Sequence, residues 1–388
     1  MKNKLLRVCS LLLIAVLAVS WIPACAEGYT IDNIRQYVAG VDEPVELADG
    51  TTRPQINFDN AATTPALIPV MEEVNQRLLM YGSIGRGFSQ KSNLSTELYE
   101  ETATPCSPSW AWIQSRIDYD YTCFYVNSTT DGLNKLASAL ITSPEDVVLS
   151  TRMEHHANDL SWRERCRVIY AEVDELGRVR YDEIERLLQE NQVKLVAVTA
   201  ASNVTGYVTD VHRIAKLAHQ YGAMIVVDGA QIVAHRDFSM KGNTPEENID
   251  FFVFSAHKMY SPYGGGAVIG LRSVLNEHMP AFYGGGTVHI VADDRVSFKE
   301  APDLYEAGSP NYPGVVGMGK AMQILKEVGF DAIQAHEQAL IRRMIDGLKQ
   351  FDNVVIYGDT EDISDRVGVV TFNFTDINFA LPALWRLQ

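Results

Sequence analysis

The sequence predicts an α/β protein with a mostly parallel central sheet and helices on both faces. Short apolar runs alternate along the chain with longer segments of helical character, and continuous apolar runs are typical of strands buried on both faces. Polar or glycine-containing motifs follow most of these runs, as at the carboxyl ends of parallel strands, where ligands bind. At 388 residues with 46% hydrophobic content, the chain is long enough for one large domain and a smaller one.

The first 26 residues are typical of an export signal. Three basic residues precede an apolar stretch from Val8 to Trp21, and Pro23-Ala24-Cys25-Ala26 follows with the small residues of a cleavage site. We expect residues 1–26 to be a signal peptide, cleaved or lipidated, and the protein to be secreted or membrane-anchored. A retained anchor is the alternative, although the apolar run is short for a membrane span. Without a functional signal, the protein would be cytoplasmic.

Residues 27–65 are predicted to form an N-terminal arm, with a short helix at Asp32–Val38 and a hairpin turn over residues 46–51. A large cofactor-binding domain is predicted over residues 66–312. Periodic apolar positions predict its helices at Pro69–Tyr81, Asp131–Ile141, Tyr181–Asn191 and Val211–Tyr221. Short apolar runs predict its strands at Thr122–Val126, Asp146–Ser150, Arg167–Tyr170, Leu195–Ala200, Met224–Val227, Phe251–Phe254 and Ala267–Gly270.

Two regions depart from this alternation. In Glu101–Tyr121, two prolines and two tryptophans stand where a helix is expected, and a divergent loop or a local reading-frame error would explain them. Residues 313–388 are predicted to form a small α+β domain, which we expect to be incomplete because the chain stops at Gln388, soon after it begins. Its predicted elements are helices at Val315–Val328 and Asp331–Lys349 and strands at Val354–Tyr357 and Gly368–Phe374.

Charge and cysteine content exclude some functions. A formal net charge of −16 argues against non-specific nucleic-acid binding. Outside the signal segment the cysteines are Cys106, Cys123 and Cys166, an odd number without regular spacing, so we expect no disulfide framework. Cys106 and Cys123 could pair in an oxidising compartment, but free buried thiols are the expectation.

Lys258 and Asp228 have the clearest chemistry. Lys258 follows the apolar run ending at Phe254, and Asp228 follows the run Met224–Val227, so each stands at the end of a predicted strand. A lysine amine can form a Schiff base with the aldehyde of pyridoxal 5'-phosphate, and an aspartate can keep the pyridine nitrogen protonated so that the ring accepts electrons. The pair therefore predicts a pyridoxal phosphate site.

Two further motifs follow predicted strands. Asn127-Ser128-Thr129-Thr130 opens a helix, where hydroxyl and free backbone N–H groups can hold a phosphate, although ordinary helix caps use the same residues. His155, in Glu154-His155-His156-Ala157-Asn158, can lie on a cofactor ring and move protons. A metal is not expected there because no third ligand has suitable spacing.

Polar side chains near the other strand ends complete the candidate site. Asn203 and Gln231 can contact a ring oxygen, whereas Ser255 and His257, which flank the strand end before Lys258, can bond to a phosphate. Together with the motifs above, these segments resemble the class V aminotransferase family, most closely its cysteine desulfurase branch. The resemblance covers roughly residues 57–374, and its matching motifs are Phe58–Thr64, Glu154–Asn158, Val227–Gln231, Phe254–Lys258 and Glu306–Asn311.

The resemblance implies a PLP-dependent transferase of fold type I in which Lys258 carries the aldimine, His155 stacks on the ring and Asp228 pairs with the pyridine nitrogen. It implies a homodimer in which Thr287 reaches the phosphate of the partner subunit. The cofactor-binding set is then Thr129, Thr130, His155, Asn203, Asp228, Gln231, Ser255, His257, Lys258 and Thr287, with no metal.

The expected function is that of a PLP-dependent enzyme acting on an amino acid, resembling cysteine desulfurase, which converts L-cysteine to L-alanine and an enzyme persulfide. A sulfur-accepting protein is a further expected partner. Relatives in the family carry a catalytic cysteine on a C-terminal loop, and the chain stops before such a loop would occur. Two alternatives stay open: other class V chemistry, as in an aminotransferase, epimerase or lyase, and a non-catalytic PLP-fold remnant.

Overall fold

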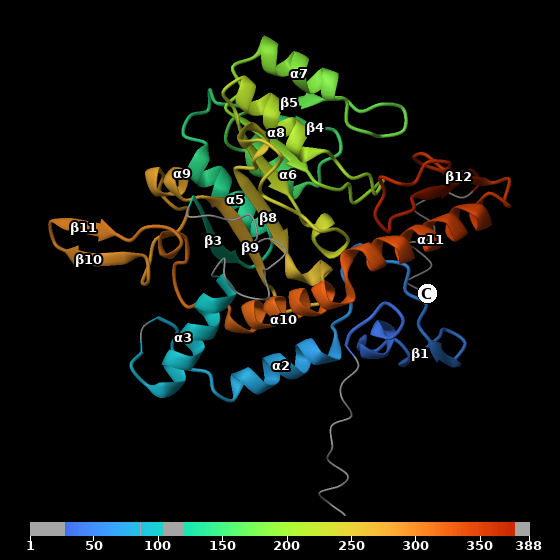
Figure 1. Ribbon diagram of the computed structural model, residues 1–388, viewed down its shortest axis with the longest axis horizontal. Coiled ribbons are helices and arrows are strands. Elements are labelled where there is room, and N and C mark those ends of the chain that lie inside the picture. Colours follow the sequence, from blue (N-terminus) through green and yellow to red (C-terminus); the bar gives the residue numbers. More distant parts are fainter. Residues whose placement is uncertain (1–27, 86, 104–119, 377–388) are drawn as a thin grey trace, which may run out of the picture.

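The computed structural model describes residues 28–85, 87–103 and 120–376 (Figure 1). Its centre is a seven-stranded sheet in the order β3-β9-β8-β7-β6-β4-β5. Only β9 runs antiparallel to its neighbours; the pairs formed among the other strands are parallel. The predicted mostly parallel sheet is therefore confirmed. The strands are β3 (Tyr121–Val126), β4 (Val147–Thr151), β5 (Arg167–Ala171), β6 (Leu195–Thr199), β7 (Met224–Asp228), β8 (Phe251–Ser255) and β9 (Gly266–Leu271).

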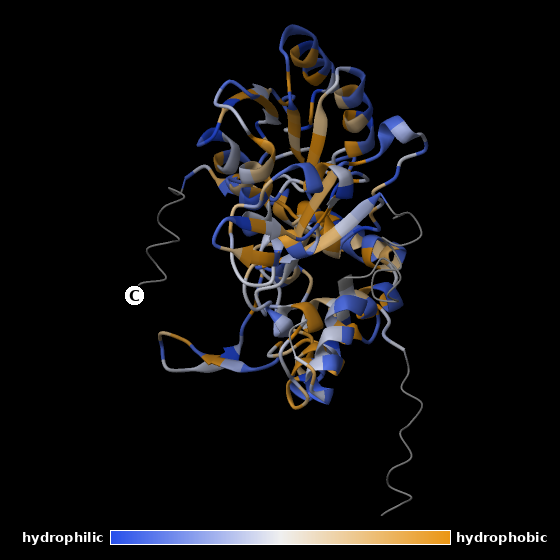
Figure 2. Cartoon of the chain, turned by 90° about the vertical axis from the view of Figure 1, so that its left-hand side faces the viewer, coloured by the Kyte–Doolittle hydropathy of each residue, from blue (hydrophilic) through white to orange (hydrophobic). Residues whose placement is uncertain are grey.

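Both faces of this sheet are buried. In β8, Phe252 and Phe254 belong to one hydrophobic cluster, whereas Phe251 and Val253 belong to a second one on the opposite face. Figure 2 shows hydrophobic residues concentrated in these central strands. Burial on two faces explains why the strands appear in the sequence as continuous apolar runs rather than as alternating ones.

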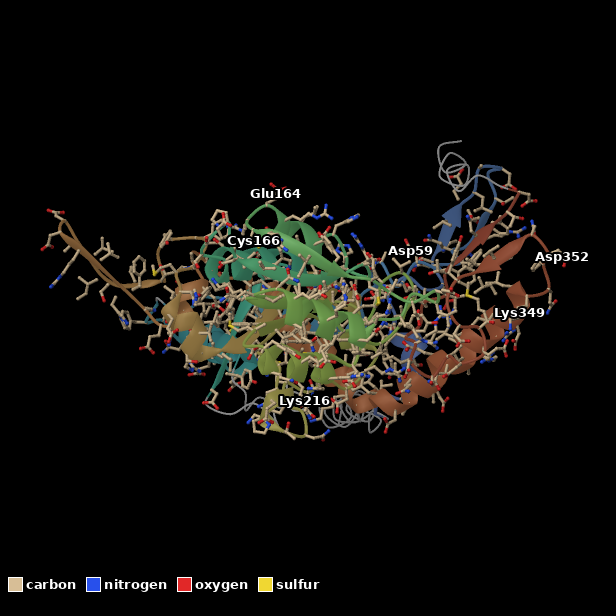
Figure 3. The ribbon with its side chains drawn as sticks, turned by 90° about the horizontal axis from the view of Figure 1, so that it is seen from above. Asp59, Glu164, Cys166, Lys216, Lys349 and Asp352 are labelled. Carbon is tan, nitrogen blue, oxygen red and sulfur yellow. The ribbon has the colours of Figure 1, made fainter. Side chains whose placement is uncertain are left out.

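Helices cover each face. Figure 3 shows the two layers from above, with Glu164 at the end of α6 on one side and Lys216 of α8 on the other. The α6 side has α5 (Thr129–Leu140), α6 (Ala157–Arg163) and α9 (Arg272–Glu277). The α8 side has α2 (Ile68–Leu78), α3 (Gln90–Ala103), α7 (Tyr181–Glu190), α8 (Val211–Gln220) and α10 (Tyr312–Val328). The predicted helices are confirmed with small shifts of their ends, and α3, α6 and α9 are additional.

Smaller elements surround this core. In the arm, η1 (Ile34–Tyr37) is shorter than the predicted helix, and β1 (Pro44–Glu46) pairs with β2 (Thr52–Pro54) around the predicted hairpin turn. A second hairpin, β10 (Val288–Ala292) with β11 (Arg295–Phe298), projects from the body (Figure 1). The short 3-10 helices are η3 (Ile232–Ala234), η4 (Pro245–Glu247), η5 (Ala256–Lys258) and η6 (Asp303–Tyr305).

After α10 the chain continues into α11 (Phe330–Leu348), β12 (Val354–Ile356) and β13 (Phe372–Phe374). A small cluster around Ile341, Ile345 and Ile363 forms their core. The predicted strand Gly368–Phe374 was too long, because only Phe372–Phe374 pairs with β12; just before the predicted strand, Val367 N donates to Gly206 O, in the loop after β6, at 2.9 Å. The domain boundaries stay predictions.

Two predicted features lie outside the described residues: the signal peptide over residues 1–26 and most of the irregular stretch 101–121. The start of that stretch is helical, as the end of α3. Among the described helices, none combines the length and apolar character needed to cross a membrane. The residues that the structure describes contain no group of three or more histidine, cysteine, aspartate or glutamate side chains arranged to hold a metal ion.

Candidate active site

The predicted site residues lie at the carboxyl end of the sheet. His155 follows β4, Asn203 follows β6, Asp228 ends β7 and Lys258 ends η5, directly after β8. Neighbouring parallel strands end at the same edge of a sheet, so residues far apart in the sequence meet there. The β9 strand, inserted between β8 and β3, does not break this arrangement because β3 points in the same direction as β8.

Lys258 contacts Gln231 and interacts electrostatically with Asp228. Its Nζ donates a hydrogen bond to Gln231 Oε1 at 2.9 Å. Partial burial lowers the pKa of Lys258 below its usual value, and the negative charge of Asp228 opposes that shift. A lysine with a lowered pKa is more readily the neutral amine that attacks an aldehyde or takes up a proton.

Asp228 is a buried carboxylate, 3% exposed. Burial raises its pKa to about 6, while a hydrogen bond from Ala230 N to its Oδ1 at 2.9 Å and the charge of Lys258 act in the opposite direction. Within the described residues it forms no ion pair within 4 Å. A buried carboxylate is stable as an anion only beside a positive charge, and a protonated pyridine nitrogen would provide one.

Gly229 allows Asp228 to end its strand so close to β8. A Cβ atom at this position would lie 2.1 Å from the ring of Phe252, which belongs to the buried core. A larger residue here would displace either the strand end or the phenyl ring. The glycine of the sequence motif is therefore required by packing rather than by a turn.

His155 is exposed at the sheet edge near Lys258. Its Nδ1 accepts a hydrogen bond from Ala157 N at 3.1 Å, which leaves the proton of the neutral ring on Nε2. Partial burial lowers the pKa of His155, and the positive charges of Lys258 and His156 lower it further. A neutral, exposed, flat ring at this place can lie against a planar cofactor.

A buried hydrogen-bond chain holds the loop of His155. Glu154 accepts from the hydroxyl of Thr151 and from the amide of Asn158, both at 2.6 Å, and Asn158 in turn accepts from Trp162 Nε1 at 3.0 Å. Burial raises the pKa of Glu154 to about 8, and the nearby Asp228 contributes to the rise. Glu154 thus anchors the loop of His155 through these hydrogen bonds. The sequence motif alone did not predict this role.

The predicted phosphate ligands meet at the start of α5. Thr129 N donates to Ser255 Oγ at 2.6 Å, and the two hydroxyl oxygens lie 2.7 Å apart. Both residues are buried, whereas Thr130 is exposed at the same helix terminus. His257 follows Ser255 by two residues, and its Nδ1 lies 3.2 Å from Thr63 Oγ1. The helix N-terminus and these polar groups suit an anion.

Two predicted site residues, Asn203 and Thr287, form no hydrogen bond with the other predicted site residues within the described part of the chain. Asn203 lies in the turn after β6, partly exposed and without a side-chain hydrogen bond inside the described region, so its amide is available to a ligand. Thr287 lies just before β10, wholly buried, with its hydroxyl donating to Gly284 O at 2.8 Å. Its contact with a partner subunit stays a prediction and would require this hydroxyl to exchange its present bond.

The sequence did not predict a role for Thr63 and Thr64, although their motif supported the family resemblance. Both hydroxyls bond to the backbone oxygen of His257. Their partner is more than 190 positions away, so no local pattern could have indicated the contact. Another motif residue, Glu306, accepts from Tyr125 N and from the hydroxyl of Tyr99, both at 2.7 Å, and so braces β3.

Comparisons with known proteins agree with this geometry. The family model described as aminotransferase class-V matches residues 56–384. A cysteine desulfurase of Haloferax volcanii is 32% identical over 353 residues, which cover 89% of this chain and 80% of that protein. A probable cysteine desulfurase of Chlamydia muridarum is 34% identical over 314 residues, covering 79% of this chain and 76% of that protein. The solved apo structure of a cysteine desulfurase from Thermococcus onnurineus has a TM-score of 0.79 and 27% identity, covering 92% of this chain and 86% of that one.

The donor set suits pyridoxal phosphate. It combines a lysine amine, an unpaired buried carboxylate, a neutral flat imidazole and hydroxyl groups at a helix N-terminus, each suited to one part of the cofactor. The match extends over most of the chain and includes every strand of the central sheet. The chain belongs to the class V aminotransferase family of pyridoxal phosphate-dependent enzymes.

Proposed function

We propose that this protein removes sulfur from L-cysteine and releases L-alanine, with Lys258 as the residue that binds the cofactor covalently. The observation that carries the proposal is the Lys258 amine, bonded to Gln231 at 2.9 Å and electrostatically coupled to the buried Asp228. The similarity to proteins named cysteine desulfurases supports the choice of substrate.

Pyridoxal phosphate, when bound, supplies an aldehyde that takes up the amine of an amino acid and a protonated ring that draws electrons from its Cα. Asp228 would hold the proton on the ring nitrogen, because its buried carboxylate forms no ion pair within 4 Å among the described residues and a protonated nitrogen would give it one. Lys258, with its lowered pKa, takes the proton from the substrate Cα and returns it. His155, neutral and with its free proton on Nε2, can move a proton at the exposed face.

Sulfur removal also requires a thiolate. The C–S bond of cysteine breaks, the sulfur joins the attacking thiolate as a persulfide, and Cβ takes up a proton to become the methyl group of alanine. Of the two cysteines in the described residues, Cys123 is buried within β3, where burial raises its pKa, and Cys166 precedes β5, at the opposite end of the sheet from Lys258. We therefore propose that neither of these two is the acceptor. Cys106 lies outside the described residues, and a separate sulfur-accepting protein is the proposed source of the thiolate.

The test is an assay of alanine and sulfide from L-cysteine in the presence of dithiothreitol, which replaces the protein acceptor. We expect stoichiometric release of both products. A Cys166→Ser variant is the matched control and should retain the activity, because that thiol lies at the amino end of its strand. Activity that disappears in Cys166→Ser while the protein stays folded would contradict this assignment.

The position of the two described thiols also favours a second candidate, a class V reaction that needs no catalytic cysteine, such as transamination or elimination. A panel of amino acids, analysed for keto acids and for exchange of the Cα proton with solvent, separates the two candidates. Keto acid from another amino acid, with no alanine from cysteine, would favour the second. A protein that binds the cofactor but exchanges no Cα proton would contradict both.

We also propose a homodimer. The β10–β11 hairpin projects from the body and exposes Ile290, Val291 and Val296 to 51%, 68% and 50% (Figure 1). A two-stranded hairpin is hardly stable in isolation, and exposed apolar side chains on it favour a covering partner. Sedimentation should give the mass of two chains, and Val291→Asp should shift it toward one chain. A wild-type monomer at micromolar concentration would contradict the proposal.

A further inference from the structure

Thr64 lies where the N-terminal arm meets the loop that carries Lys258, and its side chain is 8% exposed. Its hydroxyl accepts a hydrogen bond from Tyr260 N at 2.7 Å and donates one to His257 O at 3.1 Å. The backbone N–H of Thr64 donates to the same His257 oxygen at 3.0 Å. A single residue of the arm therefore bonds the backbone on both sides of Lys258.

The backbone after Lys258 needs such support. Tyr260 has φ 65° and is the one non-glycine residue with positive φ in the described part of the chain. A residue with a Cβ atom is strained in this region and remains there only when its surroundings hold it. Thr64 accepts from the N–H of Tyr260, and the backbone oxygen of Tyr260 accepts from Leu67 N at 3.3 Å, so Thr64 and the nearby Leu67 hold both backbone polar groups of Tyr260.

We propose that Thr64 is a positioning residue that keeps Lys258 directed toward Gln231 and Asp228, and that the N-terminal arm is thereby part of the active site. The proposal rests on the proposed function, in which Lys258 binds the cofactor. A hydroxyl can accept one hydrogen bond and donate another at the same point, which valine, of the same shape, cannot do. Serine can do both, so it should substitute for Thr64.

Hydrogen exchange of the full-length protein tests the contact without reference to activity. In Thr64→Val, the amide of Tyr260 should exchange about tenfold faster, the size expected for loss of a hydrogen bond from a buried group. Thr64→Ser should exchange as the wild type does. Thr63→Val is the matched control, because Thr63 bonds His257 O but not Tyr260 N. Unchanged protection of Tyr260 in Thr64→Val would overturn the proposal.

Borohydride trapping then tests whether the contact matters to Lys258. Across a pH series, mass spectrometry measures the fraction of Lys258 reduced onto pyridoxal phosphate. We expect the fraction in Thr64→Val to fall severalfold at neutral pH and that in Thr64→Ser to match the wild type. An equal fraction in Thr64→Val and wild type, with faster exchange at Tyr260, would make the role purely structural and overturn the proposal.

Two outcomes remain distinct. If the wild-type protein carries no reducible cofactor on Lys258, the proposed function fails and the positioning role fails with it. If the wild type carries the cofactor and Thr64→Val carries as much, only the positioning role fails. Should Thr64→Val not fold, Thr64→Ala removes the same two hydrogen bonds with a smaller side chain and takes its place in both measurements.

Discussion

Lys258→Ala is expected to abolish turnover of any amino acid substrate, with a loss of about 10⁴-fold or more. The variant loses both the covalent link to the cofactor and the amine that moves the Cα proton, and a positioned acid–base group alone contributes up to about 10⁴-fold. The wild-type protein should be yellow and should retain the cofactor on Lys258 after borohydride reduction. The variant should bind the cofactor reversibly and lose it on dialysis after the same treatment.

Lys216→Ala is a suitable control for this measurement. Lys216 lies on the surface of α8 and forms an ion pair with Glu247 at 3.2 Å (Figure 3). It is not one of the predicted site residues. Its removal tests whether loss of any lysine changes the result, and we expect wild-type activity and wild-type cofactor attachment. Reducible attachment that persists in Lys258→Ala would show that another amine holds the cofactor.

Asp228→Asn is expected to lower kcat by about 10²- to 10³-fold, the range measured when one preorganised electrostatic group is removed from an active site. Asparagine keeps the shape of the side chain and can still accept the bond from Ala230 N, but it cannot hold a proton on the ring nitrogen. The phosphate contacts remain, so cofactor retention should fall much less than kcat. Equal losses of retention and kcat would contradict the assigned role.

The same substitution should stabilise the cofactor-free protein at neutral pH. Burial raises the pKa of folded Asp228 to about 6, above its ordinary value, so its contribution is most favourable at low pH and is lost as pH rises through about 6. Asparagine, which does not titrate, should therefore gain about 2–3 kcal/mol over aspartate above pH 6. Thermal unfolding of both proteins from pH 4 to pH 8 tests this.

The matched control for this pair of measurements is Asp250→Asn. Asp250 is also buried, but its carboxylate already has partners, His219 Nε2 at 2.9 Å and Ile225 N at 2.8 Å. Removing its charge should destabilise the protein at neutral pH without altering kcat of the folded fraction. A stability gain in Asp228→Asn that is absent in Asp250→Asn would identify an unpaired buried charge as the cause.

Much of the central domain could be predicted because its signals are local. Each buried strand is a short apolar run; Asp228 directly follows one of these runs and Lys258 comes four residues after another, so the sequence indicates both the strand ends and the residues with chemical roles beside them. The sequence did not indicate the short helix α6 or the β10–β11 hairpin. The first has only seven residues and the second exposes apolar side chains, so neither has the periodic pattern of a half-buried element.

The amino-acid sequence alone determined the class of fold and the chemical identity of the cofactor, and it predicts that Lys258 is the lysine that binds this cofactor. Only the tertiary structure decided that Thr64 bonds both sides of the Lys258 loop, that Glu154 anchors the loop of His155 from a half-buried position, and that Asp228 forms no ion pair with any other described residue. These hydrogen bonds, and the lack of an ion pair at Asp228, depend on which residues surround each side chain in the folded protein rather than on its neighbours in the sequence. They depend on which distant segments a folded chain brings within hydrogen-bond distance and on how much water it excludes, and neither is encoded by the residues adjacent to a motif.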